Sequence, residues 1–227
     1  MLRVYAITNR APLRLGRGAE KEPLRAVAAS GLVLVVGEVG APPLTPEALT
    51  AHDAVVRRLA GRCPALLPAR FSWTAASDAE LAGAIAPHRD DVLTALRLVT
   101  GCVQMNVRVL GKRSAVDASP RAPEKAIATG EGEGTRYLKR RAHVLREAES
   151  LPELAPLNAR LEGLLRARRE ERQAAGELLG TAYHLVGRGR LRTYRARVAR
   201  AAVTLRPLRL RVSGPWAAYA FGPETLR

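Results

Sequence analysis

The sequence predicts an α+β protein with two successive domains, over residues 1–98 and 99–227. Segments in which apolar and polar residues alternate, as in strands with one buried face, are separated by segments with apolar residues three and four positions apart, as in amphipathic helices. The chain has 227 residues, of which 47% are hydrophobic. A chain of this length and composition can bury two cores without the help of disulfide bonds.

The first predicted domain begins with a small sheet. Its expected strands are residues 2–8, 24–29 and 31–38. A helix is expected to follow Thr45, because threonine is a favourable N-cap, Pro46 fits the first helical position and Glu47 complements the positive end of the helix. Gly61 is expected to end this helix.

An edge strand and two more helices complete this predicted domain. Residues 65–71 are mostly apolar, but Pro68 cannot donate a ladder hydrogen bond and therefore suits the edge of a sheet. Residues 77–80 form a capping box, the signature of a helix start. Pro87 can begin a further helix, which Gly101 ends.

The second predicted domain begins with a strand at residues 103–109, where apolar and polar residues alternate. Residues 111–134 contain many glycines and prolines and are expected to form an exposed loop. Residues 135–176 are expected to form a helical arm, because their leucines recur at helical spacing in two stretches. The remaining expected elements are a strand at 178–186, a helix at 191–205 and a strand at 208–213.

The charge of the chain raises nucleic acid as a possible partner. The formal net charge is +16, and residues 136–227 hold 20 basic against 8 acidic residues, a net charge of +12. A basic nucleic-acid-binding module acting through this arginine-rich half is therefore one hypothesis. However, the arginines lack the interleaved aromatic residues of a single-strand binder, and the sequence has no RNP, KH or zinc-finger pattern. A solvated amphipathic helix face is the preferred interpretation.

The residues that usually carry catalysis or bind metals are scattered. The four histidines are in separate segments, without metal-ligand spacing: His52, His88, His143 and His184. Cys63 and Cys102 suit a reducing cytosol better than a disulfide framework. The first residues do not have the layout of a signal peptide, and the apolar runs are too short to span a bilayer. We expect a cytoplasmic protein that is not an enzyme and has no metal, no cofactor and no membrane partner.

Three of the nine aromatic residues of the chain lie close together near its end, at Trp216, Tyr219 and Phe221, after a Gly214-Pro215 turn. Such a cluster either anchors a terminus in a core or presents an adhesive surface. We expect the anchor, with Trp216 buried between the last strand and a helix of the second domain.

Four blocks follow one another along the chain: residues 66–71, 101–109, 134–138 and 214–221. Taken in this order, together with the strands at 4–7 and 31–36, they resemble the gas vesicle protein L/F family (GvpL/GvpF), accessory proteins of gas vesicle assembly. The resemblance covers nearly the whole chain. Departures from the family pattern include Gln104 in place of a usual glutamate and Ala217-Ala218 in place of two prolines.

The resemblance implies a second domain with a modified ferredoxin-like α/β sandwich and a helical protrusion. It implies no catalytic residue. It also implies that the chain binds the small, apolar major shell protein, and other gas vesicle accessory proteins, during assembly of the gas-filled compartment. Such shell subunits need shielding before they assemble, because apolar surface and open strand edges aggregate. We expect the strand edge with Leu66, Leu67, Arg70 and Phe71 to provide the binding surface, by strand addition or a helix groove.

Overall fold

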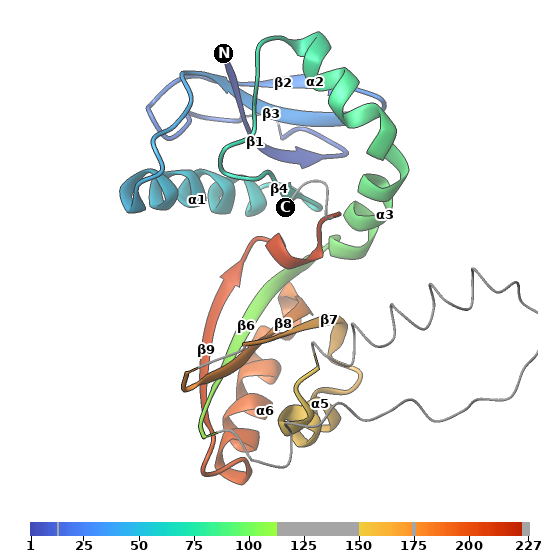
Figure 1. Ribbon diagram of the computed structural model, residues 1–227. Coiled ribbons are helices and arrows are strands. Elements are labelled where there is room, and N and C mark those ends of the chain that lie inside the picture. The colour runs from blue at the N-terminus through green and yellow to red at the C-terminus, as the bar shows by residue number, and fades with distance from the viewer. Residues whose placement is uncertain (13, 113–149, 174–175, 224–227) are drawn as a thin grey trace, which may run out of the picture.

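The computed structural model describes residues 1–12, 14–112, 150–173 and 176–223 and contains two antiparallel sheets, one in each half of an elongated molecule (Figure 1). The first sheet has the order β2-β3-β1-β4, and β5 also pairs with β1. Its strands are β1 Leu2–Thr8, β2 Leu24–Ala29, β3 Leu32–Glu38, β4 Leu67–Pro68 and β5 Thr74–Ala75.

Helices cover both faces of the first sheet. They are α1 Pro46–Ala60, α2 Asp78–Ile85 and α3 Arg89–Val99, with a short 3-10 helix, η1 Ala86–His88, before α3. One face packs on α1 and the other on α2 and α3. All seven residues of β1 are consequently buried, because this central strand has a core on each side.

The two predicted helix starts in this half are confirmed. The Thr45 hydroxyl accepts a hydrogen bond from the Ala48 amide at 3.2 Å. The Ser77 hydroxyl accepts one from the Glu80 amide at 3.2 Å, and the Glu80 carboxylate accepts one from the Ala76 amide at 2.7 Å. Both helices therefore begin where side-chain oxygens satisfy amides that have no partner within the helix.

The second half has a ferredoxin-like order of elements, β-α-β-β-α-β, as expected. Its sheet has the order β7-β8-β6-β9, and α5 and α6 pack on one face to form a second core. The strands are β6 Cys102–Leu110, β7 Leu165–Arg172, β8 Leu178–Gly187 and β9 Arg209–Trp216. The helices are α5 Ala155–Leu161 and α6 Leu191–Thr204, with the 3-10 turns η3 Pro152–Leu154, η4 Arg188–Arg190 and η5 Tyr219–Phe221.

The predicted helical arm over 135–176 is helical at η3 and α5, but the prediction is wrong beyond Leu161. The helix α5 ends at Leu161, and Gly163 adopts a positive φ of 71°, which turns the chain out of the helix. Residues 165–172 then pair with β8 as a strand. Residues 135–149 and most of the predicted loop 111–134 lie outside the described residues. The last strand also continues through Gly214 and Pro215 to Trp216 instead of ending before them.

The two halves share side-chain packing. Leu185 of β8, together with Ala218 and Phe221 near the end of the chain, belongs to the buried cluster formed by β1, β4 and α3. Arg188 donates a hydrogen bond to the Ala60 carbonyl at 2.6 Å. The link between the sheets is the turn at Thr100 and Gly101. The predicted domain boundary between residues 98 and 99 lies close to this turn, and it stays a prediction.

Candidate interaction surface and C-terminal anchor

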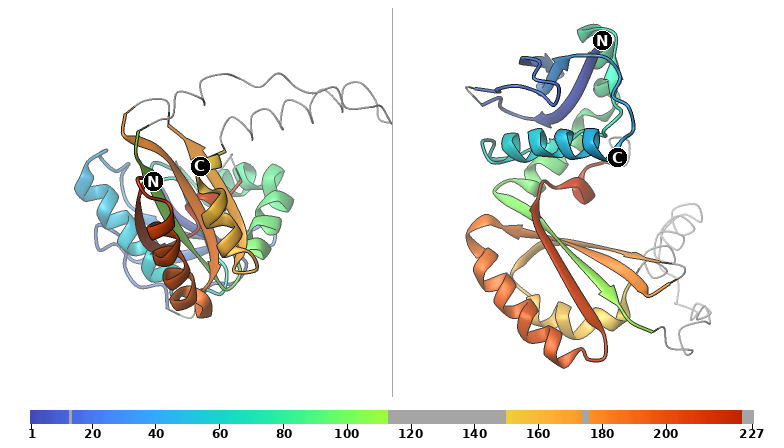
Figure 2. Two further views of the ribbon diagram at one scale, coloured as in Figure 1. Left: turned by 90° about the horizontal axis from the view of Figure 1, so that it is seen from below. Right: turned by 90° about the vertical axis from the view of Figure 1, so that its left-hand side faces the viewer.

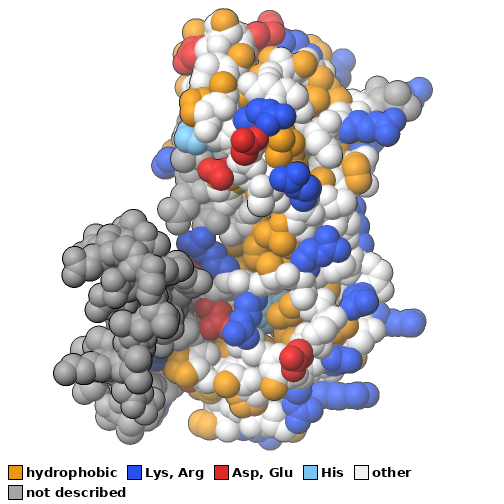
Figure 3. All heavy atoms as spheres, turned by 90° about the vertical axis from the view of Figure 1, so that its right-hand side faces the viewer, with side chains coloured by type: hydrophobic (Ala, Val, Ile, Leu, Met, Phe, Trp, Pro, Cys, Tyr) orange, Lys and Arg blue, Asp and Glu red, His pale blue; other side chains and the backbone are white. Residues whose placement is uncertain are grey.

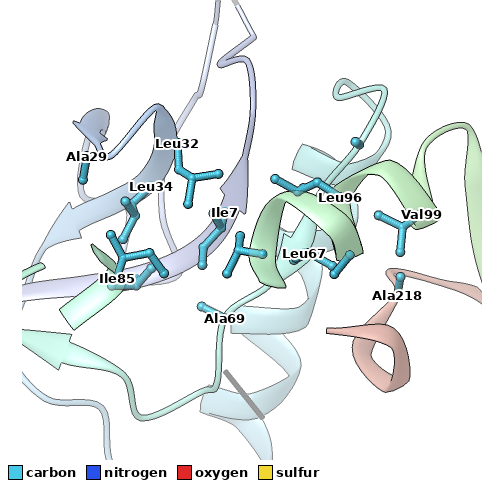
Figure 4. Packing of buried hydrophobic residues seen from close by; sticks show 14 of the residues in the cluster. Ile7, Ala29, Leu32, Leu34, Leu67, Ala69, Ile85, Leu96, Val99 and Ala218 are labelled. Carbon is cyan, nitrogen blue, oxygen red and sulfur yellow. The ribbon is translucent and has the colours of Figure 1, made fainter. Parts of the chain in front are cut away.

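The predicted strand edge is present, but its leucines are not available to a partner. Leu67 lies in β4 opposite Ile7 of β1, and the side chains of Leu66 and Leu67 are both buried. In Figure 4, Leu67 belongs to a cluster with Leu96 and Val99 of α3 and with Ala218. The expectation that Leu66 and Leu67 touch the shell protein does not fit this burial, because Leu67 packs with α3 and Ala218, and Leu66 packs with α1 and Ala217.

Arg70 and Phe71 remain accessible. Arg70 is exposed and Phe71 is half-buried. The Phe71 ring lies edge-on to the ring of His52 in α1, with centroids 5.4 Å apart, and His52 stacks on Tyr5 of β1 at 4.9 Å. A column of three rings thus leads from the surface at Phe71 to the centre of the sheet.

Two further apolar side chains are exposed at the N-terminal end of α1. Leu49 is one helical turn before His52 on α1 and is 43% exposed, and Leu44, just before the helix, is 82% exposed. We call Leu44, Leu49, Arg70 and Phe71 the α1 patch. Sequence reasoning missed Leu44 and Leu49 because apolar residues at the start of an amphipathic helix are normally assigned to its buried face.

Beneath the column lies a buried polar network that joins β1 to residues 19–22. The Arg3 guanidinium is buried and bonds Glu20 at 2.5 Å and the Gly40 carbonyl at 3.1 Å. The Tyr5 hydroxyl donates to Glu22 and accepts from the Ala19 amide. Burial, together with the hydrogen bond to Glu22, raises the pKa of Tyr5 to about 12. The sequence signal for this network is Arg3, a charge inside an otherwise apolar strand.

Two histidines are buried in their neutral form. Burial, with a further contribution from the Arg3 charge, lowers the pKa of His52 to about 4. Burial also lowers the pKa of His184 to about 4, assisted by Arg168. His184 Nδ1 lies 2.8 Å from the Tyr194 hydroxyl in the second core. Within the described ranges, no three His, Cys, Asp or Glu side chains gather as metal ligands would.

The C-terminal segment anchors the second half to the first. The Tyr219 hydroxyl donates to Asp53 of α1 at 3.0 Å, and Phe221 is buried in the core of the first half. The Ala220 amide donates to the side chain of Gln104 at 2.8 Å. Burial and the neighbouring Asp53 raise the pKa of Tyr219. Tyr219 and Phe221 therefore both contact the first half, and the anchoring role of the aromatic cluster stays a prediction.

The prediction for Trp216 is wrong in two respects. Its ring is half-buried, and it lies beside α1 of the first half, with the Arg57 guanidinium 5.5 Å from the ring centre. Its indole donates to the Ser213 hydroxyl at 3.3 Å. The buried positions are Ala217 and Ala218, because only small side chains fit where the segment passes between the two sheets. Gly214 and Pro215, the last two predicted anchor residues, continue strand β9.

The fold of the chain matches that of two solved structures. Over 97% of this chain and 98% of that chain, the structure is similar to the crystal structure of gas vesicle protein GvpF from Microcystis aeruginosa, with a TM-score of 0.71 and 15% identity. The crystal structure of GvpF from Anabaena sp. PCC7120 matches with a TM-score of 0.69, at 15% identity over 98% of this chain and 95% of that one. The chain therefore has the fold of the GvpF proteins.

The sequence comparisons identify the family. The family model described as "Gas vesicle synthesis protein GvpL/GvpF" matches residues 2–223, and the chain belongs to this family. "Gas vesicle protein L" from Streptomyces sp. (strain CB03234) is 29% identical over 248 residues, which cover 96% of this chain and 91% of that protein. The resemblance of the four sequence blocks is thus confirmed, and the chain has a role in gas vesicle formation. The family is not one of known enzymes.

Proposed function

We propose that the protein is a non-enzymatic, chaperone-like assembly factor that binds the small apolar shell protein while gas vesicles nucleate in the cytoplasm. The family match over residues 2–223 carries this proposal. Shell subunits must present apolar surface to a gas phase, so they need a partner that covers this surface until they are assembled. Other accessory proteins of gas vesicle assembly are further partners on this hypothesis.

The α1 patch is the best-supported candidate for the shell-binding surface. It combines two exposed leucines with a half-buried phenylalanine and an exposed arginine, so it offers apolar surface together with two residue types that are enriched at protein interfaces. Arg70 and Phe71 come from the originally predicted binding segment, whereas Leu44 and Leu49 replace the buried Leu66 and Leu67. No helix among the described residues is long and apolar enough to cross a membrane.

The test is co-purification of the full chain with the major shell protein of its own gas vesicle cluster, at low and high salt. The variant Leu44→Glu/Leu49→Glu should lower the recovery of shell protein about tenfold or more, because it places two charges in an apolar contact. The matched control is Ala199→Glu/Val203→Glu, which places the same two charges at exposed positions of α6 in the second half, and binding should persist there. Undiminished binding by the first variant would disprove the assignment to this patch.

Point variants are preferable to removal of residues 1–98. Leu185, Ala218 and Phe221 pack into the core of the first half, so a truncated chain would expose apolar surface of its own. Apolar binding should also resist salt, whereas a complex held by phosphates weakens steeply as salt rises. Loss of all binding at high salt, with retention of nucleic acid at low salt, would favour the hypothesis based on charge.

A further inference from the structure

The strand β9 is an edge of the second sheet and has no strand partner on its outer side among the described residues. Most of its eight residues are exposed, and β9 is the most exposed strand of this sheet. In Figure 2, the right-hand view looks onto this edge, and β9 lies at the surface of the molecule. Such an edge presents unpaired backbone N–H and C=O groups and can accept an additional strand.

The two sheet faces at this edge have different chemistry. Arg209 and Arg211 are exposed on the face opposite the helices, and Arg211 lies directly across from Arg108 of β6. Leu210 and Val212 pair with Val109 and Val107, so they lie on the face that α5 and α6 cover. Val212 is nevertheless 41% exposed, because it is at the margin of that face.

The arginines of this edge are not neutralised within the strand. Residues 187–216 contain nine arginines and no acidic residue. Like charges directly across a strand pair are destabilising, and neither Arg108 nor Arg211 forms an ion pair with any residue that the structure describes. Arg209 bonds Glu177 at 3.1 Å, but both side chains are well exposed, so that pair is weak and exchangeable.

The opposite edge of the sheet differs. In β7, Arg169 pairs with Glu171 and Arg172 with Glu153, and Glu170 accepts a hydrogen bond from the Leu151 amide. Two of the arginines of this edge are therefore paired with carboxylates of the second half. Figure 3 looks onto the side of the molecule that carries this β7 edge, and in its lower half acidic and basic side chains lie next to one another.

A shallow groove continues the apolar side of the edge toward α6. Its lining combines apolar and basic residues: Ala202, Arg206, Pro207, Leu208, Arg209 and Leu210. Val203 on the same part of α6 is 64% exposed. The groove thus adds apolar surface on the helix side of β9, where an incoming strand would place every second side chain.

We propose that the outer edge of β9 binds an extended acidic segment of a partner protein as a fifth strand. Acidic residues at alternate positions of that segment pair with Arg209 and Arg211, and the apolar residues between them pack against Leu210 and Val212. Charge complementarity and strand period together define this partner. The site is separate from the α1 patch, so the chain can hold this partner and a shell subunit at the same time.

The probe for this site is a fluorescein-labelled peptide of about eight residues in which glutamate alternates with valine or threonine. Its affinity for the full chain is measured by fluorescence anisotropy at physiological ionic strength. We expect Arg209→Glu/Arg211→Glu to weaken binding by about tenfold or more. The control Arg192→Glu/Arg200→Glu, which makes the same charge change at exposed positions of α6, should change affinity less than about twofold because distant charges are screened.

Two further measurements test whether the peptide binds to β9 as an additional strand. Amide hydrogen exchange of the native chain should slow within residues 209–216 when the peptide is bound, because an added strand protects the outward amides. The same peptide with N-methyl groups at alternate backbone positions keeps its charges but cannot form the ladder, and it should bind about tenfold more weakly.

The proposal would be overturned if the N-methylated peptide bound as tightly as the unmodified peptide, or if Arg192→Glu/Arg200→Glu weakened binding as much as Arg209→Glu/Arg211→Glu. It would also be overturned if a single-stranded oligonucleotide bound more tightly than the peptide, or if the peptide did not bind up to about 1 mM.

Discussion

At the residue scale, the buried neutral histidines make stability depend on pH. An unfolded histidine has a pKa near 6.5, and burial lowers the pKa of His52 and of His184 to about 4. Between these values the unfolded state binds more protons than the folded state. Stability is therefore fully present above about pH 6.5 and falls as the pH approaches 4, by on the order of 3 kcal/mol for each histidine.

We predict that His52→Phe removes about half of the decrease in the free energy of unfolding that the two histidines cause at low pH. The ring of phenylalanine keeps the stacking with Tyr5 and Phe71 but cannot take up a proton. Urea unfolding at pH 7 and pH 4.5 gives the difference in the free energy of unfolding for both proteins. An unchanged difference in the variant would show that His52 titrates normally in the folded state.

At the element scale, strand β9 depends on one glycine. Gly214 has a φ of 120°, and a Cβ there would lie 2.9 Å from the Gln104 carbonyl oxygen. Any other residue therefore meets both backbone strain and a backbone atom that cannot move aside.

We predict that Gly214→Ala lowers the free energy of unfolding by about 2–4 kcal/mol. The control is Gly101→Ala, at a φ of 69° with open space around it, which should lower it by about 1 kcal/mol. Chemical denaturation of the three proteins provides the comparison. Similar losses for the two variants would mean that the contact with Gln104 is not a constraint.

Local signals predicted local structure well. Thr45 and Ser77 begin helices as expected, because a cap acts within one turn of its own position. The arm over 135–176 was wrong beyond Leu161, because leucines at helical spacing do not reveal that pairing with β8 outweighs helix formation at 165–172. The expectation that Leu66 and Leu67 are accessible to a partner also failed, because the C-terminal segment that packs on them lies about 150 residues later in the sequence.

At the scale of the whole molecule, the C-terminal segment holds the halves together. Phe221 is in the first core, while Ala220 bonds Gln104 of the second sheet. The buried polar network around Arg3 and the docking of this segment could not be read from the sequence, because both depend on contacts between residues far apart along the chain.

We predict that Phe221→Ala lowers the free energy of unfolding by about 3 kcal/mol and speeds amide exchange in β4 and α3. The neighbouring Tyr219→Phe removes only the hydrogen bond to Asp53 near the surface and should cost about 1 kcal/mol or less. Denaturation and hydrogen exchange of both variants separate the two effects. Unchanged exchange in β4 for Phe221→Ala would contradict the role of this residue in joining the halves.

The docking of Ala218 and Phe221 also has a consequence for biosynthesis. Strand β4 and helix α3 leave the ribosome long before residues 217–221 are translated, yet their shared core includes side chains from that late segment. Domains usually fold in order as they emerge, but here the core of the first half stays incomplete until residues 217–221 arrive. The apolar surface beneath Ala218 and Phe221 is uncovered throughout that interval, and exposed apolar surface of this kind favours aggregation.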